Sequence, residues 1–333
     1  MGGERMTLMR HLLTRERTAI APADLAFVME RIDLAGKRIA VELSRASLGG
    51  ELGYTGEINV QGEKQKKLDE WTNKVFLETF EHGYPVCSLV SEEMEEPRHY
   101  SRNCRGQSYA VIYDPLDGSS NTDINGSLGT IFSVRARVHG HGENAADLLG
   151  PGTQQVAAGY IVYGPATQLV YTAGAGVDLF TLDDRLGEFI LWIENHRMPK
   201  FGGTYAVNQG NVNKWHPGAR KFVEHITSRK DKRTSYSSRY CGALVADFHR
   251  CLLEGGIYMY PSEVATDGKR KGKIRLMYEI APLAMVAEQA GGRASNGKMR
   301  ALDIVPREIH ERQPVYIGSA DEVSLAEEFR VEE

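Results

Sequence analysis

The stretch Asp114-Pro115-Leu116-Asp117-Gly118-Ser119-Ser120-Asn121 decides both the fold and the chemistry of this chain. It follows the apolar run Tyr109–Tyr113, which predicts a buried strand that ends in two carboxylates three residues apart. Gly118 permits a tight bend into a helix N-terminus. Free backbone N–H groups and the positive end of the helix dipole favour a bound phosphate at such a position.

The two carboxylates require a cation if a phosphate is to bind beside them. At about 4 Å and an effective dielectric constant near 20, each contact between like charges costs about 4 kcal/mol. Hard oxygen ligands together with a phosphate indicate magnesium, or manganese. The alternative is an N-capped helix whose aspartates only bind backbone N–H groups, and the full eight-residue string disfavours it.

Four further acidic residues are candidates for the same site. Glu92 and Glu93 leave a second apolar run; adjacent glutamates are usually solvated, but a second strand end that carries carboxylates favours joint metal ligation. Asp69 lies on a charged predicted helix, and Glu279 is expected to end a strand before a helix that begins with Pro282. Neither residue indicates a function on its own.

Amphipathic spacing predicts helices at both ends of the chain and strands between them. The first helix opens at Pro22 and stops at Gly49. The other predicted helices are Glu63–Phe80, Pro217–Ser228, Cys241–Glu254, Pro282–Ala290 and Ala320–Phe329. A mostly antiparallel sheet is predicted from the runs Thr130–Val138, Val156–Tyr163, Gln168–Thr172, Leu179–Leu182 and Glu188–Trp192.

The helical pattern resumes after about His196, and we place a domain boundary there. Residues 1–195 are expected to form an N-terminal domain that carries the metal carboxylates and an effector site. Residues 196–333 are expected to form a C-terminal domain that binds a sugar phosphate. The Gly-, Asn- and Asp-rich stretch His139–Thr153 is expected to be a mobile loop within the first of them.

Composition excludes several classes of function. The 333 residues are 41% hydrophobic and 25% charged, which are globular proportions, and the net charge of −4 predicts no attraction to nucleic acid. An anionic substrate must therefore be held by a local pocket. The sequence contains no run of 18 apolar residues, so we predict no membrane span. Its four scattered cysteines favour a reduced chain. We therefore expect a cytoplasmic chain and disfavour a targeting peptide. Walker A, H-E-x-x-H and G-x-S-x-G motifs are absent from the sequence.

Beyond these features, the sequence resembles the class I fructose-1,6-bisphosphatases over nearly its whole length. The matching strings besides Asp114–Asn121 are Lys66–Asp69, Leu89–Glu93, Gly129–Phe132, Ala158–Gly164, Ser238–Gly242, Val245–Arg250, Gly255–Pro261, Gly272–Glu279 and Glu288–Gly292. The Asp-Pro-x-Asp-Gly core is shared with inositol monophosphatases and related lithium-sensitive phosphatases. The C-terminal strings favour the bisphosphatase.

The resemblance implies a fold and an activity. The implied fold is α/β, a layered α-β-α-β-α sandwich of the sugar phosphatase type with the active site at the junction of two domains. The implied reaction is the magnesium-dependent hydrolysis of fructose 1,6-bisphosphate to fructose 6-phosphate and phosphate, a step of gluconeogenesis. A homotetramer is also implied, with a small sugar bisphosphate as the partner molecule and with no nucleic acid or membrane.

The resemblance also implies roles for particular residues. The metal ligands would be Glu92, Asp114, the carbonyl of Leu116, Asp117 and Glu279. Asp69 and Glu93 would position and deprotonate the attacking water. The implied substrate-binding residues are Asp117, Gly118, Ser119, Ser120, Asn208, Arg239, Tyr240, Tyr258, Met259, Tyr260 and Lys273, with Arg239 reaching in from a neighbouring subunit.

The sequence departs from the family pattern at the site that binds the inhibitor AMP. The turn whose backbone N–H groups receive the AMP phosphate reads Pro22–Leu25 here, and proline has no N–H to donate. The lysine of a Lys-Tyr pair that holds AMP is replaced by Ser108. We therefore expect weak or absent AMP inhibition. The segment between Tyr260 and Lys273 is longer and more basic than usual, which predicts a solvated loop or an altered substrate rim.

The sequence is also compatible with two alternative functions. Sedoheptulose-1,7-bisphosphatase activity, alone or in addition, would use the same carboxylates. A non-catalytic regulator that binds a sugar phosphate would need no general base, and the intact carboxylates at every matching position disfavour it.

Overall fold

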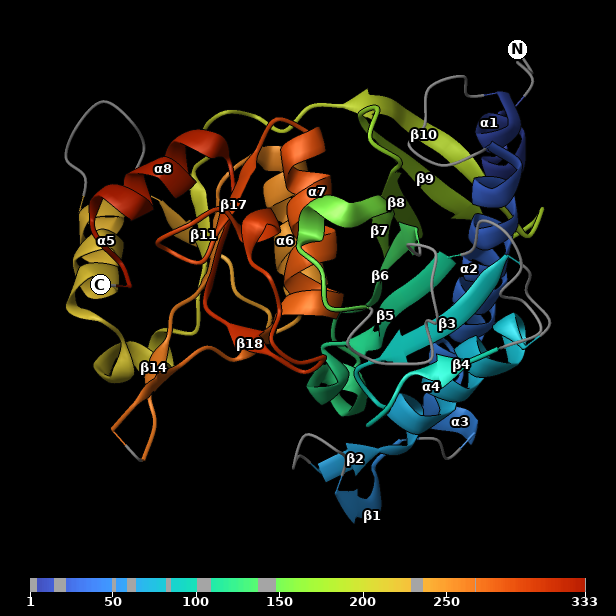
Figure 1. The fold of residues 1–333 in the computed structure, drawn as a ribbon, viewed down its shortest axis with the longest axis horizontal. Helices are drawn as coiled ribbons and strands as arrows, with labels where there is room; N and C mark the ends of the chain where they lie inside the picture. The colour runs from blue at the N-terminus through green and yellow to red at the C-terminus, as the bar shows by residue number, and fades with distance from the viewer. Residues whose placement is uncertain are drawn as a thin grey trace.

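The computed structural model describes residues 5–14, 22–49, 52–58, 64–81, 85–100, 109–136, 148–228, 236–266 and 268–332. Within these residues the chain forms two large sheets that alternate with layers of helices, and three two-stranded sheets (Figure 1). In the described part of the chain, no helix is long and apolar enough to cross a membrane.

The larger sheet has the strand order β10-β9-β8-β7-β6-β5-β3-β4. Its strands are β3 Val86–Ser91, β4 Arg98–His99, β5 Tyr109–Asp117, β6 Leu128–Ala136, β7 Gln155–Tyr163, β8 Thr167–Thr172, β9 Val177–Asp183 and β10 Glu188–His196. Neighbouring strands are antiparallel except β3 and β5, which run parallel. The predicted antiparallel sheet is therefore confirmed, and it extends to include the strand that carries Asp114.

Side-chain alternation along the strands gives the larger sheet two apolar faces. On β6, Phe132 and Val134 pack in one core cluster, with α1 Leu8–Thr14, α2 Pro22–Leu43 and α4 Lys67–Phe80. Ile131 packs in a second cluster on the opposite face, with α6 Leu244–Glu254 and α7 Ala281–Gln289. Both faces are buried, which explains the nearly continuous apolar runs in this part of the sequence.

The smaller sheet has the strand order β12-β11-β13-β19-β17. Its strands are β11 Thr204–Ala206, β12 Ser237–Ser238, β13 Ile257–Tyr260, β17 Arg293–Ser295 and β19 Val315–Gly318. One face packs on α6 and α7, and the other on α5 Pro217–Thr227 and α8 Ala320–Glu328. The layers therefore run helix, sheet, helix, sheet, helix, and the predicted five-layer sandwich is confirmed.

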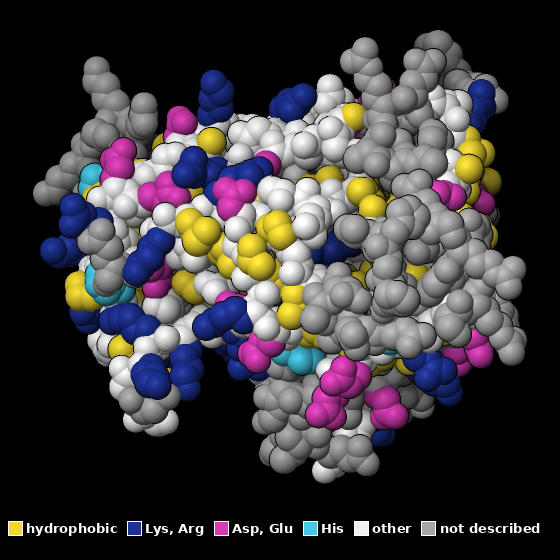
Figure 2. All heavy atoms as spheres, viewed as in Figure 1, with side chains coloured by type: hydrophobic (Ala, Val, Ile, Leu, Met, Phe, Trp, Pro, Cys, Tyr) yellow, Lys and Arg dark blue, Asp and Glu magenta, His cyan; other side chains and the backbone are white. Residues whose placement is uncertain are grey.

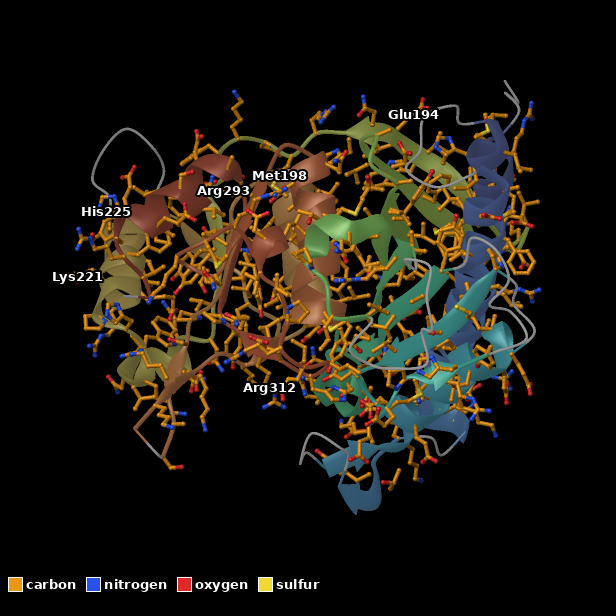
Figure 3. The ribbon with its side chains drawn as sticks, viewed as in Figure 1. Glu194, Met198, Lys221, His225, Arg293 and Arg312 are labelled. Carbon is orange, nitrogen blue, oxygen red and sulfur yellow. The ribbon has the colours of Figure 1, made fainter. Side chains whose placement is uncertain are left out.

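The helices α6 and α7 form a middle layer that both sheets share. Their cluster joins Ile131 and Tyr160 of the larger sheet to Tyr258 and Ile317 of the smaller one. The link between the sheets passes the end of α7, where the Met198 backbone N–H donates to the Ala290 carbonyl over 2.9 Å. Figure 3 marks the extent of the layers, with Lys221 and His225 of α5 at one end and Glu194 of β10 toward the other. The domain division at residue 196 stays a prediction.

Two predicted helices in the first part of the chain have different bounds. The helix from Pro22 ends at Leu43, and a separate short helix, α3, covers Ala46–Gly49. The Ser44 hydroxyl donates to the Val41 carbonyl over 2.7 Å, a local bond that competes with helix propagation. Of the predicted helix Glu63–Phe80, residue 63 lies outside the described residues.

The second of these helices begins at Lys67, because Lys66 has an extended backbone and is the N-cap residue, with Asp69 in the first turn. The preceding residues Lys64–Lys66 form β2, which pairs with β1 Tyr54–Ile58. The carboxylate of Asp69 accepts from the Lys66 backbone N–H over 3.3 Å. The residues from Glu63 to Lys67 are all polar or charged, so no apolar spacing fixes where this helix begins, and the bond between Lys66 and Asp69 marks its start.

Smaller differences occur in the second part of the chain. The predicted helix from Cys241 begins at Leu244, because Gly242 has a left-handed backbone with φ of 83°. The predicted basic loop after Tyr260 contains a short hairpin, in which β14 Glu263–Val264 pairs with β15 Arg270–Lys271. Lys and Arg side chains gather on this hairpin in Figure 2. Within the predicted loop His139–Thr153, residues 139–147 lie outside the described part of the chain.

Gly129 on β6 allows the start of α6 to approach the larger sheet, and its replacement tests this contact. A Cβ at Gly129 would lie 2.2 Å from Val245 Cγ1 and 2.6 Å from the Ile161 carbonyl oxygen. Gly129→Ala is therefore expected to lower the free energy of unfolding by about 1–3 kcal/mol, measured by urea denaturation. Gly164→Ala is the control, since its Cβ would come no closer than 3.8 Å to the Ala166 carbonyl. Equal stability of the two variants would contradict the close approach.

Candidate functional site

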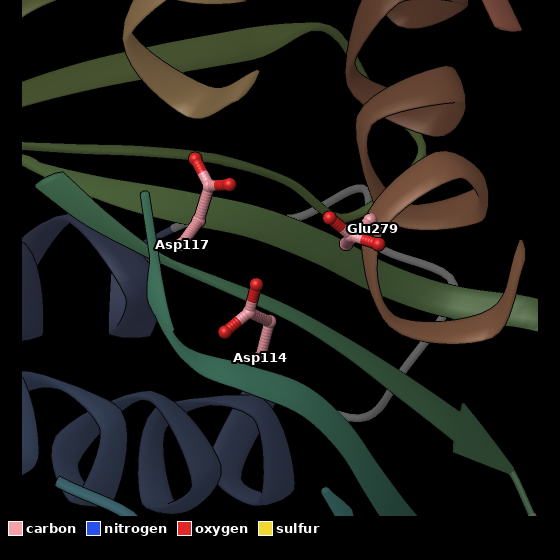
Figure 4. A group of neighbouring side chains, drawn as sticks. All are labelled: Asp114, Asp117 and Glu279. Atoms are coloured by element: carbon pink, nitrogen blue, oxygen red, sulfur yellow. The ribbon is translucent and has the colours of Figure 1, made fainter. Parts of the chain in front are cut away.

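Three buried carboxylates converge at the junction of β5 with the segment that precedes α7. Asp114 and Asp117 come from the end of β5, and Glu279 comes from the opposite side (Figure 4). Oxygens of the three side chains lie within 4.8 Å of one another. Each side chain is almost fully buried. This arrangement is a site with three negative charges when all three groups are ionised.

Burial raises the pKa of each of these carboxyl groups. The pKa of Asp117 rises to about 7 and that of Glu279 to about 8, and the pKa of Asp114 lies well above its ordinary value. Repulsion from the neighbouring charge of Glu92 adds to burial in all three cases. A divalent cation among these oxygens would favour the ionised forms, and hard carboxylate oxygens are the donors that magnesium and manganese prefer. The residues therefore fit such a metal.

Backbone N–H groups hold the three carboxylates in place. The Val245 N–H donates to Asp117 Oδ2 over 2.7 Å, the Leu116 N–H to Asp114 Oδ1 over 3.0 Å, and the Arg275 N–H to Glu279 Oε2 over 2.6 Å. The donor to Asp117 belongs to the first turn of α6, so this aspartate also bonds to the helix that both sheets share. The three carboxylates are thus oriented by protein groups alone.

The prediction that Glu279 ends a strand is wrong. Glu279 lies in a π-helical turn, Leu276–Ile280, between the short strand β16 Ile274–Arg275 and α7. The wide turn is anchored at its start, where the Leu276 N–H donates to the Glu311 carbonyl over 2.8 Å. Such turns are common at functional sites, because the extra residue redirects a side chain. Here the turn directs Glu279 toward β5.

The prediction of a helix after Gly118 is confirmed only in part. Gly118 has φ of 79°, and a 3₁₀-helix follows it over Ser119–Ile124. A Cβ at Gly118 would lie 2.5 Å from the Ala243 Cβ, so this position requires glycine for space as well as for conformation. The turn brings Gly118, Ser119 and Ser120 to the wall of the cavity described next.

A cavity of about 210 Å³ unites the carboxylates with most of the predicted site residues. The predicted residues that line it are Asp69, Glu92, Glu93, Asp114, Leu116, Asp117, Gly118, Ser119, Ser120, Tyr240, Tyr258, Tyr260, Lys273 and Glu279. The lining combines two kinds of group. Carboxylates come from β5 and the π-helical turn, and the other polar groups include three tyrosines and Lys273.

Three of the predicted substrate-binding residues do not line this cavity. Met259 is buried in the core cluster under α5, because strand alternation directs it away from Tyr258 and Tyr260. The exposed Arg239 donates from its guanidinium to the Ser238 carbonyl over 2.8 Å. Asn208 is half-buried, and its side chain bonds to Tyr260. Burial raises the pKa of the Tyr260 phenol, and the bond from Asn208 opposes part of that rise.

The tyrosine part of the cavity offers hydroxyl and ammonium donors. Lys273 Nζ lies 5.8 Å from the centre of the Tyr260 ring, within the range of a cation–π contact. Burial raises the pKa of Tyr240 and of Tyr258, so both phenols keep their protons at neutral pH. Protonated phenols beside an ammonium group are donors suited to a phosphate.

Asp69 lies at the wall of the same cavity, at the start of α4. Burial raises its pKa to about 6, although hydrogen bonds from the Lys66 backbone and the Ser119 side chain oppose the rise. The buried Lys66 ammonium donates to Thr122 Oγ1 over 2.9 Å and to Asp123 Oδ2 over 2.8 Å. This contact joins the start of α4 to the 3₁₀-helix after Gly118.

Sequence reasoning missed four residues of the cavity wall: Gly242, Leu244, Ile274 and Arg275. Arg275 is the informative one, because its guanidinium Nη2 lies 2.7 Å from Glu92 Oε1. The two side chains are mostly buried, so the ion pair is shielded from water. The string Gly272–Glu279 contained the signal, since an arginine four residues before a candidate ligand indicates a charge partner.

Comparisons with known proteins agree over almost the whole chain. Residues 6–194 match the family model "Fructose-1-6-bisphosphatase, N-terminal domain", and residues 198–330 match the C-terminal domain of the same enzyme. The class 1 fructose-1,6-bisphosphatase of Trichormus variabilis is 49% identical over 97% of this chain and 91% of its own length. The corresponding enzyme of a Synechococcus strain is 50% identical over 96% of this chain and 95% of its own.

Solved structures give the same result. The holo form of Leishmania major fructose-1,6-bisphosphatase superposes with a TM-score of 0.90 at 40% identity, and covers 98% of this chain and 99% of its own. The T-state structure of the same enzyme gives a TM-score of 0.85 at 38% identity, with the same coverage.

The raised pKa values at the carboxylate cluster predict how stability depends on pH. Asp117 and Glu279 have higher pKa values in the folded chain than in the unfolded chain. Protonation of these two carboxyl groups therefore stabilises the folded chain fully near pH 4, and this stabilisation is lost as the pH rises to about 8. The metal-free protein is therefore expected to unfold at a lower temperature at pH 8 than at pH 5.5. Added magnesium should raise the unfolding temperature more at pH 8, since its ligands are then ionised.

Asp117→Asn separates this effect from other titrating groups. The amide oxygen can still accept from the Val245 N–H, but the side chain no longer titrates. Calorimetry in EDTA should show a smaller loss of stability between the two pH values in this variant than in the wild type. An identical pH dependence, together with an identical response to magnesium, would exclude Asp117 from the site.

Proposed function

The chain belongs to the fructose-1,6-bisphosphatase family, and we propose that it hydrolyses fructose 1,6-bisphosphate to fructose 6-phosphate and inorganic phosphate. The reaction is a phosphoric monoester hydrolysis of gluconeogenesis. The observation that carries the proposal is a single cavity whose lining combines a carboxylate cluster with tyrosines and a lysine. A substrate with two phosphates matches these two kinds of group.

The reacting phosphate binds at the carboxylate part of the cavity. Asp114, Asp117, Glu279, Glu92 and the carbonyl of Leu116 would hold the catalytic magnesium ions. When bound, these ions neutralise the phosphate oxygens and stabilise the leaving alkoxide. The proximity of Asp114, Asp117 and Glu279 oxygens supports this ligand set. Glu92 lies in the same cavity but pairs with Arg275, so its ligation requires the ion pair to open or to share the carboxylate.

Asp69 and Glu93 act on the water that attacks phosphorus. Both carboxylates line the cavity, and a pKa of about 6 leaves Asp69 mostly ionised at neutral pH and able to accept a proton. The backbone N–H groups and hydroxyls of Gly118, Ser119 and Ser120 bind the equatorial oxygens of the phosphate. The short 3₁₀-helix supports this role because it begins at the cavity wall.

The distal phosphate binds to Tyr240, Tyr260 and Lys273. Charge-assisted hydrogen bonds of this kind contribute about 1.5–3 kcal/mol each, so they orient the reacting end. Arg239 completes the subsite from a neighbouring subunit of a homotetramer; its exposure at the molecular surface supports this assignment. Tyr258 lines the same cavity and contacts the sugar, whereas the Met259 side chain packs in the core under α5.

Asp117→Asn tests the metal assignment by activity. Magnesium-dependent phosphate release from fructose 1,6-bisphosphate should fall by roughly 10²-fold or more, since the variant removes charge at the reacting phosphate. The exposed Asp184→Asn is the matched control and should retain wild-type activity. Circular dichroism should show both variants folded. Near-normal magnesium-dependent activity of the Asp117 variant would overturn the assignment.

The same assay separates the alternative functions. Comparable phosphate release from sedoheptulose 1,7-bisphosphate would extend the substrate class to the longer sugar. Binding of fructose 1,6-bisphosphate without any phosphate release in magnesium or manganese would instead identify a non-catalytic regulator. Omission of the metal is the control for both measurements.

AMP is expected to inhibit this enzyme weakly or not at all. Pro22 is the first residue of α2, where it removes one of the free N–H groups that a helix N-terminus offers to a phosphate. Ser108, the second departure, lies outside the described residues. Activity at saturating magnesium should therefore be unchanged at micromolar AMP. Half-maximal inhibition in that concentration range would contradict the expectation.

A further inference from the structure

Glu332 is a buried carboxylate that no part of the proposed reaction uses. It follows α8 and is 8% exposed. Its Oε1 accepts from the Ser262 backbone N–H over 2.9 Å and from the Tyr316 hydroxyl over 2.7 Å. Its Oε2 accepts a hydrogen bond from the Ser262 hydroxyl. The buried Glu332 carboxylate thus accepts three hydrogen bonds beside the smaller sheet.

These donors lie just after the strand that carries the distal subsite and on one neighbouring strand. Ser262 is two residues after Tyr260, at the exit of β13. Tyr316 belongs to β19, where it is the register partner of Met259 on β13. The carboxylate therefore joins the exit of β13 to the neighbouring strand. Loss of this junction would free the backbone immediately after Tyr260.

A second set of contacts connects the same exit to the Tyr260 hydroxyl. Glu263, the next residue after Ser262, accepts from Asn211 Nδ2 over 2.5 Å. The side chains of Asn211 and Asn208 both bond to Tyr260. The position of Ser262 therefore influences Tyr260 through the backbone on one side and through Glu263 and Asn211 on the other.

We propose that Glu332 is a positioning residue that sets the distal phosphate subsite by fixing Ser262 at the exit of β13. This inference rests on the proposed function of Tyr260 and Lys273. Glu332 does not line the cavity itself. Its removal should therefore weaken recognition of the second phosphate and leave the chemistry at the first one intact.

The test compares two substrates that share a reacting end. Fructose 1,6-bisphosphate uses the distal subsite, whereas fructose 1-phosphate has no group to place there. Glu332→Ala should raise KM for the bisphosphate roughly tenfold, which is the effect of losing about one hydrogen bond to a charged group. Its kcat for the bisphosphate should change little, and kcat/KM for fructose 1-phosphate should stay within about twofold of the wild type.

Glu332→Gln should rescue the alanine variant. The amide oxygen can accept from the Ser262 N–H and from Tyr316, and the amide N–H can donate to the Ser262 hydroxyl, which is able to accept. The exposed Glu328→Ala, on α8, is the matched control and should leave both substrates unaffected. Thermal unfolding of every variant shows whether a loss of activity reflects unfolding.

Tyr260→Phe separates this inference from the function on which it rests. If that variant raises KM for the bisphosphate but Glu332→Ala does not, Glu332 has no positioning role. If Tyr260→Phe leaves KM unchanged, the distal subsite itself is assigned wrongly. Equal losses on both substrates after Glu332→Ala, or no rescue by glutamine, would also overturn the proposal, because a general loss of structure would then explain the effect.

Discussion

Electrostatic repulsion among Asp114, Asp117 and Glu279 is the constraint around which this structure is organised. Three buried carboxylates with oxygens within 4.8 Å of one another oppose folding unless protons or a cation neutralise them. The surrounding fold supplies the opposing stabilisation. Strand β5 is buried along its whole length, and backbone N–H groups from three segments orient the carboxylates. The fold thus holds three carboxylates close together, and a bound metal can neutralise their charge and bind a phosphate.

The close contacts around this cluster explain where the chain requires glycine. Gly118 and Gly129 lie on the two sides of the α6 N-terminus, against Ala243 and Val245. A larger residue at either position would move the N–H group that holds Asp117. Because α6 also packs on Tyr258 of the smaller sheet, the same contacts relate the carboxylates to the distal part of the cavity.

The sequence predicted the parts of the site that depend on short local patterns. The apolar run before Asp114 and the turn at Gly118 are local, and both were recognised with the correct type of structure. The direction of Glu279 depends on a π-helical turn, which has no periodicity that a helix or strand pattern could reveal. Arg275 was missed for a different reason: its partner Glu92 is distant in sequence, and only the folded chain brings the two side chains together.

Family resemblance implies a role for a residue but not the direction of its side chain. It implied that Met259 binds substrate; the alternation of β13 directs this side chain into the core, and the role of the residue stays a prediction. The start of α4 was placed too early, at Glu63, whereas Lys64–Lys66 pair with β1 as the strand β2. These three residues are Lys-Gln-Lys, so they carry no apolar alternation from which a strand could be predicted.

The middle layer of α6 and α7 has a consequence for how the chain can be divided. Both helices come from the second part of the sequence, yet they cover one apolar face of the sheet built by the first part. A fragment that ended near residue 196 would expose that face to water, and exposed sheet faces promote aggregation. A recombination that joined the first half to an unrelated second half would leave the same apolar sheet face uncovered. The two halves are therefore two regions of sequence that share one layer of the core.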